Sequence, residues 1–66
     1  MQHYQAIETY VELNLDIEAE EARRGSYPQE IGIKLFKLLE TMTSTQIKEG
    51  EALLERVREV KRMGNL

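Results

Sequence analysis

Residues 4–22 read YQAIETYVELNLDIEAEEA, and this stretch decides the fold. Its apolar side chains recur every three or four residues, which is the spacing of an amphipathic α-helix. At about 100° per residue, these side chains form two stripes along the helix. The first stripe comprises Tyr4, Ile7, Val11, Leu15 and Ala22. The second stripe comprises Ala6, Tyr10, Leu13 and Ile17.

The two stripes together cover well over half of the helix circumference. A helix that lies on one small core needs an apolar arc of only about 100° or slightly more. We therefore expect the chain itself to cover the first stripe and a second copy to cover the other. The predicted assembly is a symmetric homodimer, and its self-association surface consists of Tyr4, Ala6, Tyr10, Leu13 and Ile17.

The first helical segment is expected over residues 3–24. Arg23 and Arg24 occupy its last turn, where basic side chains interact favourably with the helix dipole. Gly25 follows at the position where a left-handed residue commonly ends a helix.

A second helix is expected over residues 28–42, with Ser26 or Tyr27 as its cap. Pro28 is tolerated in the first turn because the amides there have no intrahelical acceptor. The apolar set of this helix is Ile31, Leu35, Phe36, Leu38, Leu39 and Met42.

The third helix begins at a clear signal in the stretch MTSTQI, residues 42–47. With Thr43 as the N-cap, Gln46 falls at the reciprocal position of a capping box, and Met42 pairs with Ile47 as a hydrophobic staple. This helix is expected over residues 44–63, ahead of Gly64, with an apolar face made of Ile47, Leu53, Leu54, Val57 and Val60. The short turn predicts that the second and third helices pack as an antiparallel hairpin.

Gly32 and Gly50 fall inside the apolar faces of these two helices. Each costs about 1 kcal/mol relative to alanine in a helix interior, and close approach of two backbones is the usual compensation. In the expected hairpin, Gly32 lies level with residues 54–57 and Gly50 with residues 35–39, so that each faces a large side chain. The alternative is a locally loosened helix. The predicted fold class is all-α: a single domain over residues 1–66, assembled as a homodimeric helical bundle.

Charge is uneven along a chain whose formal net charge is −3. Residues 1–24 hold six acidic and two basic side chains, whereas the third helix ends in a basic group formed by Arg56, Arg58, Lys61 and Arg62. These four residues are candidate contacts to a partner protein or to phosphates. They also suit the carboxyl end of a solvated helix and can pair with nearby glutamates, which is the favoured interpretation.

Glu18 and Glu21, with Asn14, project between the two apolar stripes of the first helix. Two interpretations are open for them. Either a lysine or arginine from a second helix meets these carboxylates, or this half of the helix extends beyond its shorter neighbour and is solvated.

The composition excludes several classes of function. The chain has no cysteine, and its one histidine, His3, lies near the terminus. No glycine-rich phosphate loop or paired metal-binding motif occurs, so we expect neither an enzyme nor a protein that holds a cofactor or metal. No apolar run approaches the roughly 20 residues of a membrane span, and the amino terminus lacks the order of a signal peptide, so we expect a cytoplasmic protein that does not enter a membrane.

The sequence therefore predicts a small regulatory or adaptor protein that acts through helical contacts with another protein. Tyr4, Tyr10 and Tyr27 suit such contacts, because tyrosine is enriched at protein interfaces. The alternative is a small transcriptional regulator that binds nucleic acid through the basic end of the third helix. The net negative charge makes this alternative the less favoured one.

Overall fold

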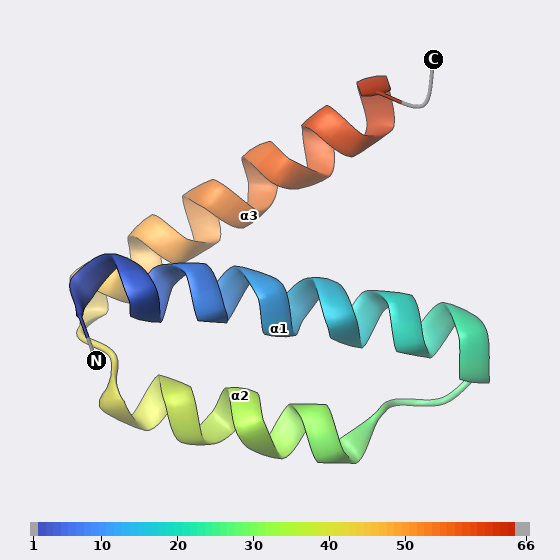
Figure 1. Ribbon diagram of the computed structural model, residues 1–66, viewed down its shortest axis with the longest axis horizontal. Coiled ribbons are helices and arrows are strands. Elements are labelled where there is room, and N and C mark those ends of the chain that lie inside the picture. The colour runs from blue at the N-terminus through green and yellow to red at the C-terminus, as the bar shows by residue number, and fades with distance from the viewer. Residues whose placement is uncertain (1, 65–66) are drawn as a thin grey trace.

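The computed structural model describes residues 2–64, and these residues form three α-helices. Helix α1 spans His3–Arg24, α2 spans Gln29–Thr41 and α3 spans Ser44–Gly64. The expected all-α class and the three helical segments are therefore confirmed for this part of the chain. In Figure 1, α1 lies between the other two helices, α2 runs back antiparallel to it, and α3 runs in the same general direction as α1 but diverges from it.

The connection between α1 and α2 begins as predicted. Gly25 has a left-handed backbone with φ 76°, and its N–H donates to the Glu21 carbonyl at 2.8 Å. Pro28, expected in the first turn of α2, instead occupies the N-cap position. Its ring is fully buried, and its carbonyl accepts hydrogen bonds from the N–H groups of Ile31 and Gly32. The proline thus anchors the start of α2 against the fold.

The capping box at the start of α3 is confirmed. The Gln46 N–H donates to the Thr43 hydroxyl at 3.1 Å, and the Thr43 N–H donates to the Gln46 side-chain oxygen at 2.9 Å. Gln46 is buried, and its side-chain nitrogen donates to the His3 carbonyl at 3.3 Å. The same glutamine therefore caps α3 and ties it to the first turn of α1.

The predicted hairpin of α2 and α3 is wrong. Each of these helices packs on α1, and they make little contact with each other. The Cα atoms extend over 33 × 27 × 15 Å, so the helices lie close to a single layer with α1 in the middle. The physical reason is the width of the apolar surface on α1, which is broad enough for two helices to pack on it.

The glycines accordingly face other residues than expected. A Cβ on Gly50 would lie 2.6 Å from Cδ1 of Tyr10, so this glycine lets α3 approach the tyrosine ring of α1. A Cβ on Gly32 would lie 2.5 Å from the Tyr27 hydroxyl oxygen. Close approach is thus the reason for both glycines, but α1 and the loop before α2 supply the neighbours.

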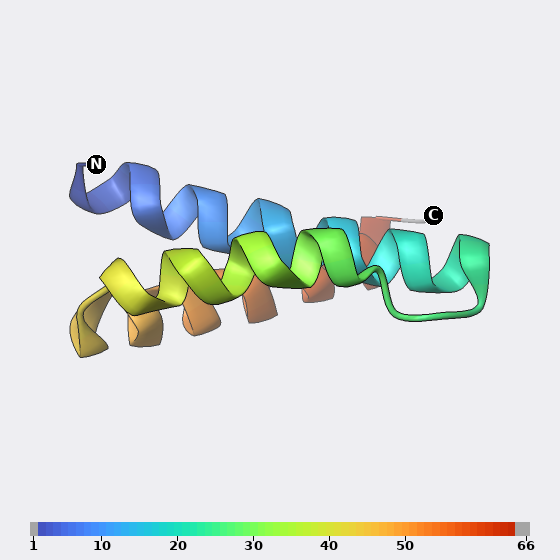
Figure 2. The same cartoon turned by 90° about the horizontal axis from the view of Figure 1, so that it is seen from below.

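Buried apolar side chains extend along α1 and α3 and include Ile7, Val11, Ile17 and Leu54. The hydrophobic core cluster lies where α1 and α3 begin and α2 ends. Ala6, Leu38 and Met42 form its buried centre. Four partly buried side chains pack against this centre, namely Tyr10, Leu13, Leu39 and Ile47. Figure 2 shows the three helix ends gathered at this side of the molecule. Met42 and Ile47 therefore both contribute to the core, as the hydrophobic staple requires.

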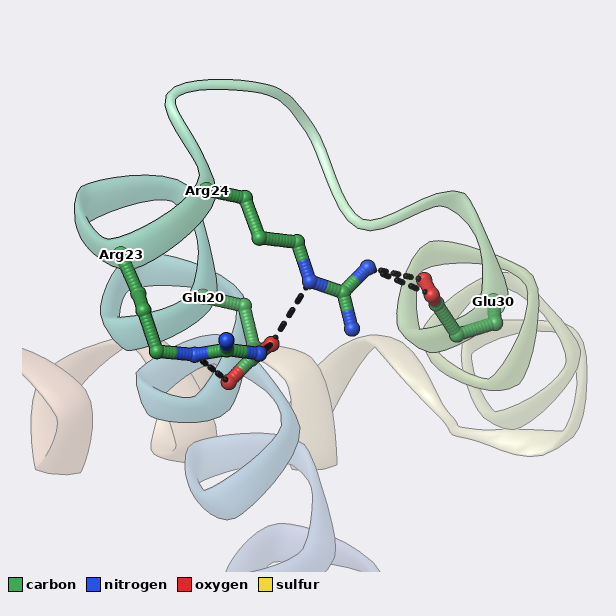
Figure 3. A network of polar contacts seen from close by, with 4 residues as sticks. All are labelled: Glu20, Arg23, Arg24 and Glu30. Atoms are coloured by element: carbon green, nitrogen blue, oxygen red, sulfur yellow. Dashed lines mark hydrogen bonds and ion pairs between the residues drawn. The ribbon is translucent and has the colours of Figure 1, made fainter.

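Ion pairs join α1 and α2 at the opposite end of the molecule. The Arg24 guanidinium donates to both carboxylate oxygens of Glu30, at 2.8 and 3.0 Å, and its Nε lies 2.8 Å from Glu20 (Figure 3). Arg23 also pairs with Glu20. Hydrogen bonds from Arg23 and Arg24, respectively, lower the pKa of Glu20 and of Glu30. Arg24 thus links α1 to α2 across the loop that begins at Gly25.

Candidate interaction surfaces

The chain itself covers most of the surface that was assigned to self-association. Ala6 and Ile17 are buried, and Tyr10 and Leu13 are half-buried against the core or α3. Only Tyr4 is largely exposed, at 73%. The second stripe is therefore an intramolecular packing surface, because α2 and α3 both lie on α1. Self-association remains a prediction, and it requires a different surface.

Tyr10 is the central side chain of the contact between α1 and α3. Its ring lies against the backbone of Gly50, and burial, with Glu51 nearby, raises the pKa of its hydroxyl. Asn14, one turn further on, donates its side-chain N–H to the Tyr10 carbonyl at 2.8 Å. This amide is thus satisfied inside its own helix.

Arginine from a second helix meets one of the two carboxylates that the sequence analysis placed between the stripes. Arg58 of α3 donates to Glu18 of α1 through Nη2 at 2.8 Å and through Nε at 3.0 Å. This hydrogen bonding raises the pKa of Arg58. Glu21, by contrast, is exposed. Among residues 2–64, the Glu18–Arg58 pair is the polar link between α1 and α3 that lies furthest along α3.

The four basic candidates occupy two different environments. Arg58 is held by Glu18, and Arg62 lies 3.5 Å from Glu55. Arg56 and Lys61 are exposed on the diverging part of α3. The structure therefore does not present these side chains as one uniform phosphate-binding cluster.

We call residues 56–63 the α3 arm. In Figure 1 this part of α3 points away from α1. Its apolar residues Val60 and Met63 are 65% and 67% exposed. Four basic side chains and one acidic side chain, Glu59, surround them. The α3 arm is thus an apolar and positively charged surface.

A second exposed apolar surface lies on α2. We call Tyr27, Ile33 and Phe36 the α2 patch; their exposed fractions are 53%, 57% and 63%. The patch borders a groove of about 400 Å³, with Gly32 among its lining residues. The polar residues of the groove are Gln29, Lys37 and Glu40. Exposed aromatic and aliphatic side chains that gather in this way are typical of protein-binding surfaces.

Sequence reasoning named Tyr27 as a contact residue but missed the other two members of the α2 patch. Phe36 was assigned to the packed face of α2, and Ile33 was not assigned to any face. The signal was present in the spacing, because Ile33 and Phe36 lie off the line of Ile31, Leu35 and Leu38 that faces α1. Two large apolar residues beside a complete apolar face indicate an additional contact surface.

Residues 2–64 present neither a metal-binding cluster nor a membrane-spanning helix. No group of three or more His, Asp or Glu side chains in this part of the chain is arranged to hold a metal ion. Within the same residues, no helix combines the length and apolarity needed to cross a membrane. Comparisons with protein-family models, with curated proteins and with solved structures gave no significant match.

Proposed function

We propose that this protein is a small non-enzymatic adaptor or regulator that binds another protein through the α3 arm. The observation that carries the proposal is the divergence of this arm from α1, which leaves Val60 and Met63 about two-thirds exposed. Exposed apolar residues on a helix that has no neighbour at that point favour the docking of a partner.

The charge of the α3 arm indicates the chemistry of the partner. The arm carries Arg56, Arg58, Lys61 and Arg62 against the single acidic residue Glu59. Methionine and arginine are both enriched at protein interfaces, and complementary charge speeds association and selects partners. The expected partner segment is an amphipathic helix with an apolar stripe bordered by Asp and Glu.

The association of the α3 arm with acidic protein is favoured over its association with nucleic acid. Arg58 and Arg62, two of the four basic side chains, already lie beside glutamates of the chain. Any acidic partner, protein or nucleic acid, competes with these carboxylates. The exposed Val60 and Met63 are what favour a protein, because a phosphate backbone would not use them. Self-association is proposed in addition, through a surface other than the second stripe of α1.

The test uses affinity purification of the intact chain from its native source, followed by binding measurements with the purified partner. Val60→Asp combined with Met63→Asp should abolish retention of the partner. The changes remove the apolar contacts and introduce carboxylates that repel an acidic partner. Tyr4→Asp, an equally exposed position on α1, is the matched control and should retain the partner. Circular dichroism checks that all three proteins stay helical.

Two results would overturn the proposal. One is a partner that binds the α3 arm variant as well as it binds the original chain. The other is a retained species that is nucleic acid and nuclease-sensitive. In the second case, duplex DNA should bind with sub-micromolar affinity at about 150 mM salt, weakening steeply as salt rises, and Arg58→Glu with Arg62→Glu should abolish that binding. We expect no such binding.

A further inference from the structure

Helix α2 carries a row of four exposed residues on the side away from α1: Gln29, Ile33, Phe36 and Glu40. All four line the groove on this helix. Successive members are four, three and four positions apart, which keeps their side chains in one line along an α-helix. The four side chains therefore form one continuous exposed row on the outside of the fold.

This row is symmetric about its midpoint. From either end it runs polar, apolar, apolar, polar, with the same spacing. When a second α2 lies antiparallel on it, Ile33 meets Phe36 of the second copy, and Gln29 meets Glu40 of the second copy. Each contact occurs twice, as a twofold interface requires.

The charge balance of α2 differs from that of α1 and of the α3 arm, and it allows two copies of α2 to pack against each other. α2 holds two acidic and two basic side chains, Glu30, Glu40, Lys34 and Lys37. α1 holds six acidic against two basic side chains, and the α3 arm holds four basic against one acidic. Two copies of α1 or two α3 arms would therefore repel each other, whereas two copies of α2 would not.

We propose that α2 pairs with α2 of a second copy in an antiparallel twofold contact centred between Ile33 and Phe36. The apolar pairs form the centre of this contact. At each end the Gln29 amide of one copy donates to the Glu40 carboxylate of the other. Tyr27, which borders the groove beside Gly32, lies at the edge of the contact.

The dimer leaves the α3 arm accessible. α2 and α3 lie on opposite sides of α1 in Figure 1, so a copy seated on α2 does not cover residues 56–63. The inference names the surface for the self-association proposed above and rests on that part of the proposed function. Docking of a partner on the α3 arm can fail without it, and the dimer can fail without the docking.

The first test is sedimentation equilibrium of the intact chain, whose monomer mass is 7.7 kDa. The original chain should form a reversible dimer in the micromolar range. Ile33→Asp with Phe36→Asp should be monomeric with an unchanged helical spectrum, since both side chains are exposed. Val60→Asp with Met63→Asp is the matched control and should remain dimeric.

A second test addresses the antiparallel register. Gln29→Glu places two glutamates together at each end of the contact and should raise the dimer dissociation constant about fivefold, on the scale of exposed charge pairs. Adding Glu40→Lys converts both ends into Glu–Lys pairs and should lower the constant below that of the original chain. Neither change weakens α2 itself, because Glu near a helix N-terminus and Lys near a C-terminus are both favourable.

Several outcomes would overturn the inference. The original chain could be monomeric at millimolar concentration, or its dimer could survive Ile33→Asp with Phe36→Asp. Equal effects of the single and double charge changes would exclude the antiparallel register. A monomer that instead binds a helix of another protein at Ile33 and Phe36 would assign the α2 patch to a different partner.

Discussion

α2 and α3 both pack on α1, but α2 stays beside α1 along all of α2, whereas α3 diverges from α1 toward the C-terminal end of α3 (Figure 1). In α2, residues 31, 35 and 38, followed by the C-cap residue Met42, place an apolar side chain against the fold at each turn. In α3, the row that faces α1 runs through Gln46, Gly50 and Leu54, which are buried, and then reaches Arg58. A helix thus stays on its neighbour only as long as its facing positions can be buried, and the part that departs becomes accessible to other molecules.

The largest expected effect on the free energy of unfolding distinguishes the packed part of α3 from the α3 arm. Leu54 is 4% exposed, so Leu54→Ala should lower the free energy of unfolding by about 2–5 kcal/mol. Val60→Ala should change it by no more than about 0.5 kcal/mol, as is usual at exposed positions. Urea unfolding followed by circular dichroism measures both. Similar losses for the two variants would mean that the arm is packed in solution.

The next effect compares the two buried or half-buried glycines. Gly50→Ala places a methyl group against Cδ1, Cε1 and Cγ of the half-buried Tyr10 ring, which has little room to move. It should destabilise the fold by roughly 1–3 kcal/mol of overpacking, offset by about 1 kcal/mol of helix propensity.

Gly32→Ala is the matched control for Gly50→Ala. The added methyl group meets the outer ring atoms of Tyr27, which is exposed and can swing away. The melting temperature should therefore fall for Gly50→Ala and stay level or rise for Gly32→Ala. A rise for both would show that α3 does not need close contact with Tyr10.

A smaller effect on stability is expected at alkaline pH, and it comes from the Tyr10 hydroxyl at the contact between α1 and α3. In the folded chain, burial raises the pKa of the Tyr10 hydroxyl above its ordinary value of 10.0. The hydroxyl therefore loses its proton more readily in the unfolded chain. Stability from this group is fully present below pH 10 and is lost as the pH rises through the folded value. Tyr10→Phe should lose less stability than the original chain between about pH 9 and 11. Identical alkaline profiles for the two proteins would contradict a buried hydroxyl.

The smallest effect concerns the ion pairs between α1 and α2. Glu20 and Glu30 have lowered pKa values because arginines donate hydrogen bonds to them. Their stabilisation is present above the ordinary carboxyl pKa and is lost as the pH falls through the lowered values. Thermal melts of the original chain and of Glu30→Gln should converge as the pH is lowered to about 2. The difference is small even at pH 7, since both carboxylates are in contact with solvent.

Local signals in the sequence predicted local structure well. Gly25 predicted the end of α1, and the Thr43–Gln46 capping box predicted the start of α3. These signals succeed because they depend on hydrogen bonds between residues a few positions apart. Neighbouring residues alone determine such bonds, whatever the rest of the chain does.

The candidate surfaces were predicted less well, because they depend on which helix covers which stripe. Tyr10 and Leu13 were assigned to self-association, whereas they pack against other residues of the same chain. Ile33 and Phe36 were not recognised as exposed. One sequence with two apolar stripes on a helix is compatible with two neighbours from the same chain or with one neighbour and a second copy.

The sequence by itself determined three helices, the end of α1, the start of α3 and the two apolar stripes of α1. Only the tertiary structure decided that α2 and α3 both lie on α1, that Gly50 faces Tyr10, and that Ile33, Phe36, Val60 and Met63 stay exposed. The physical reason is that periodicity identifies the side of a helix that is apolar but carries no information about its neighbour. That choice follows from the total apolar surface that three connected helices can bury together.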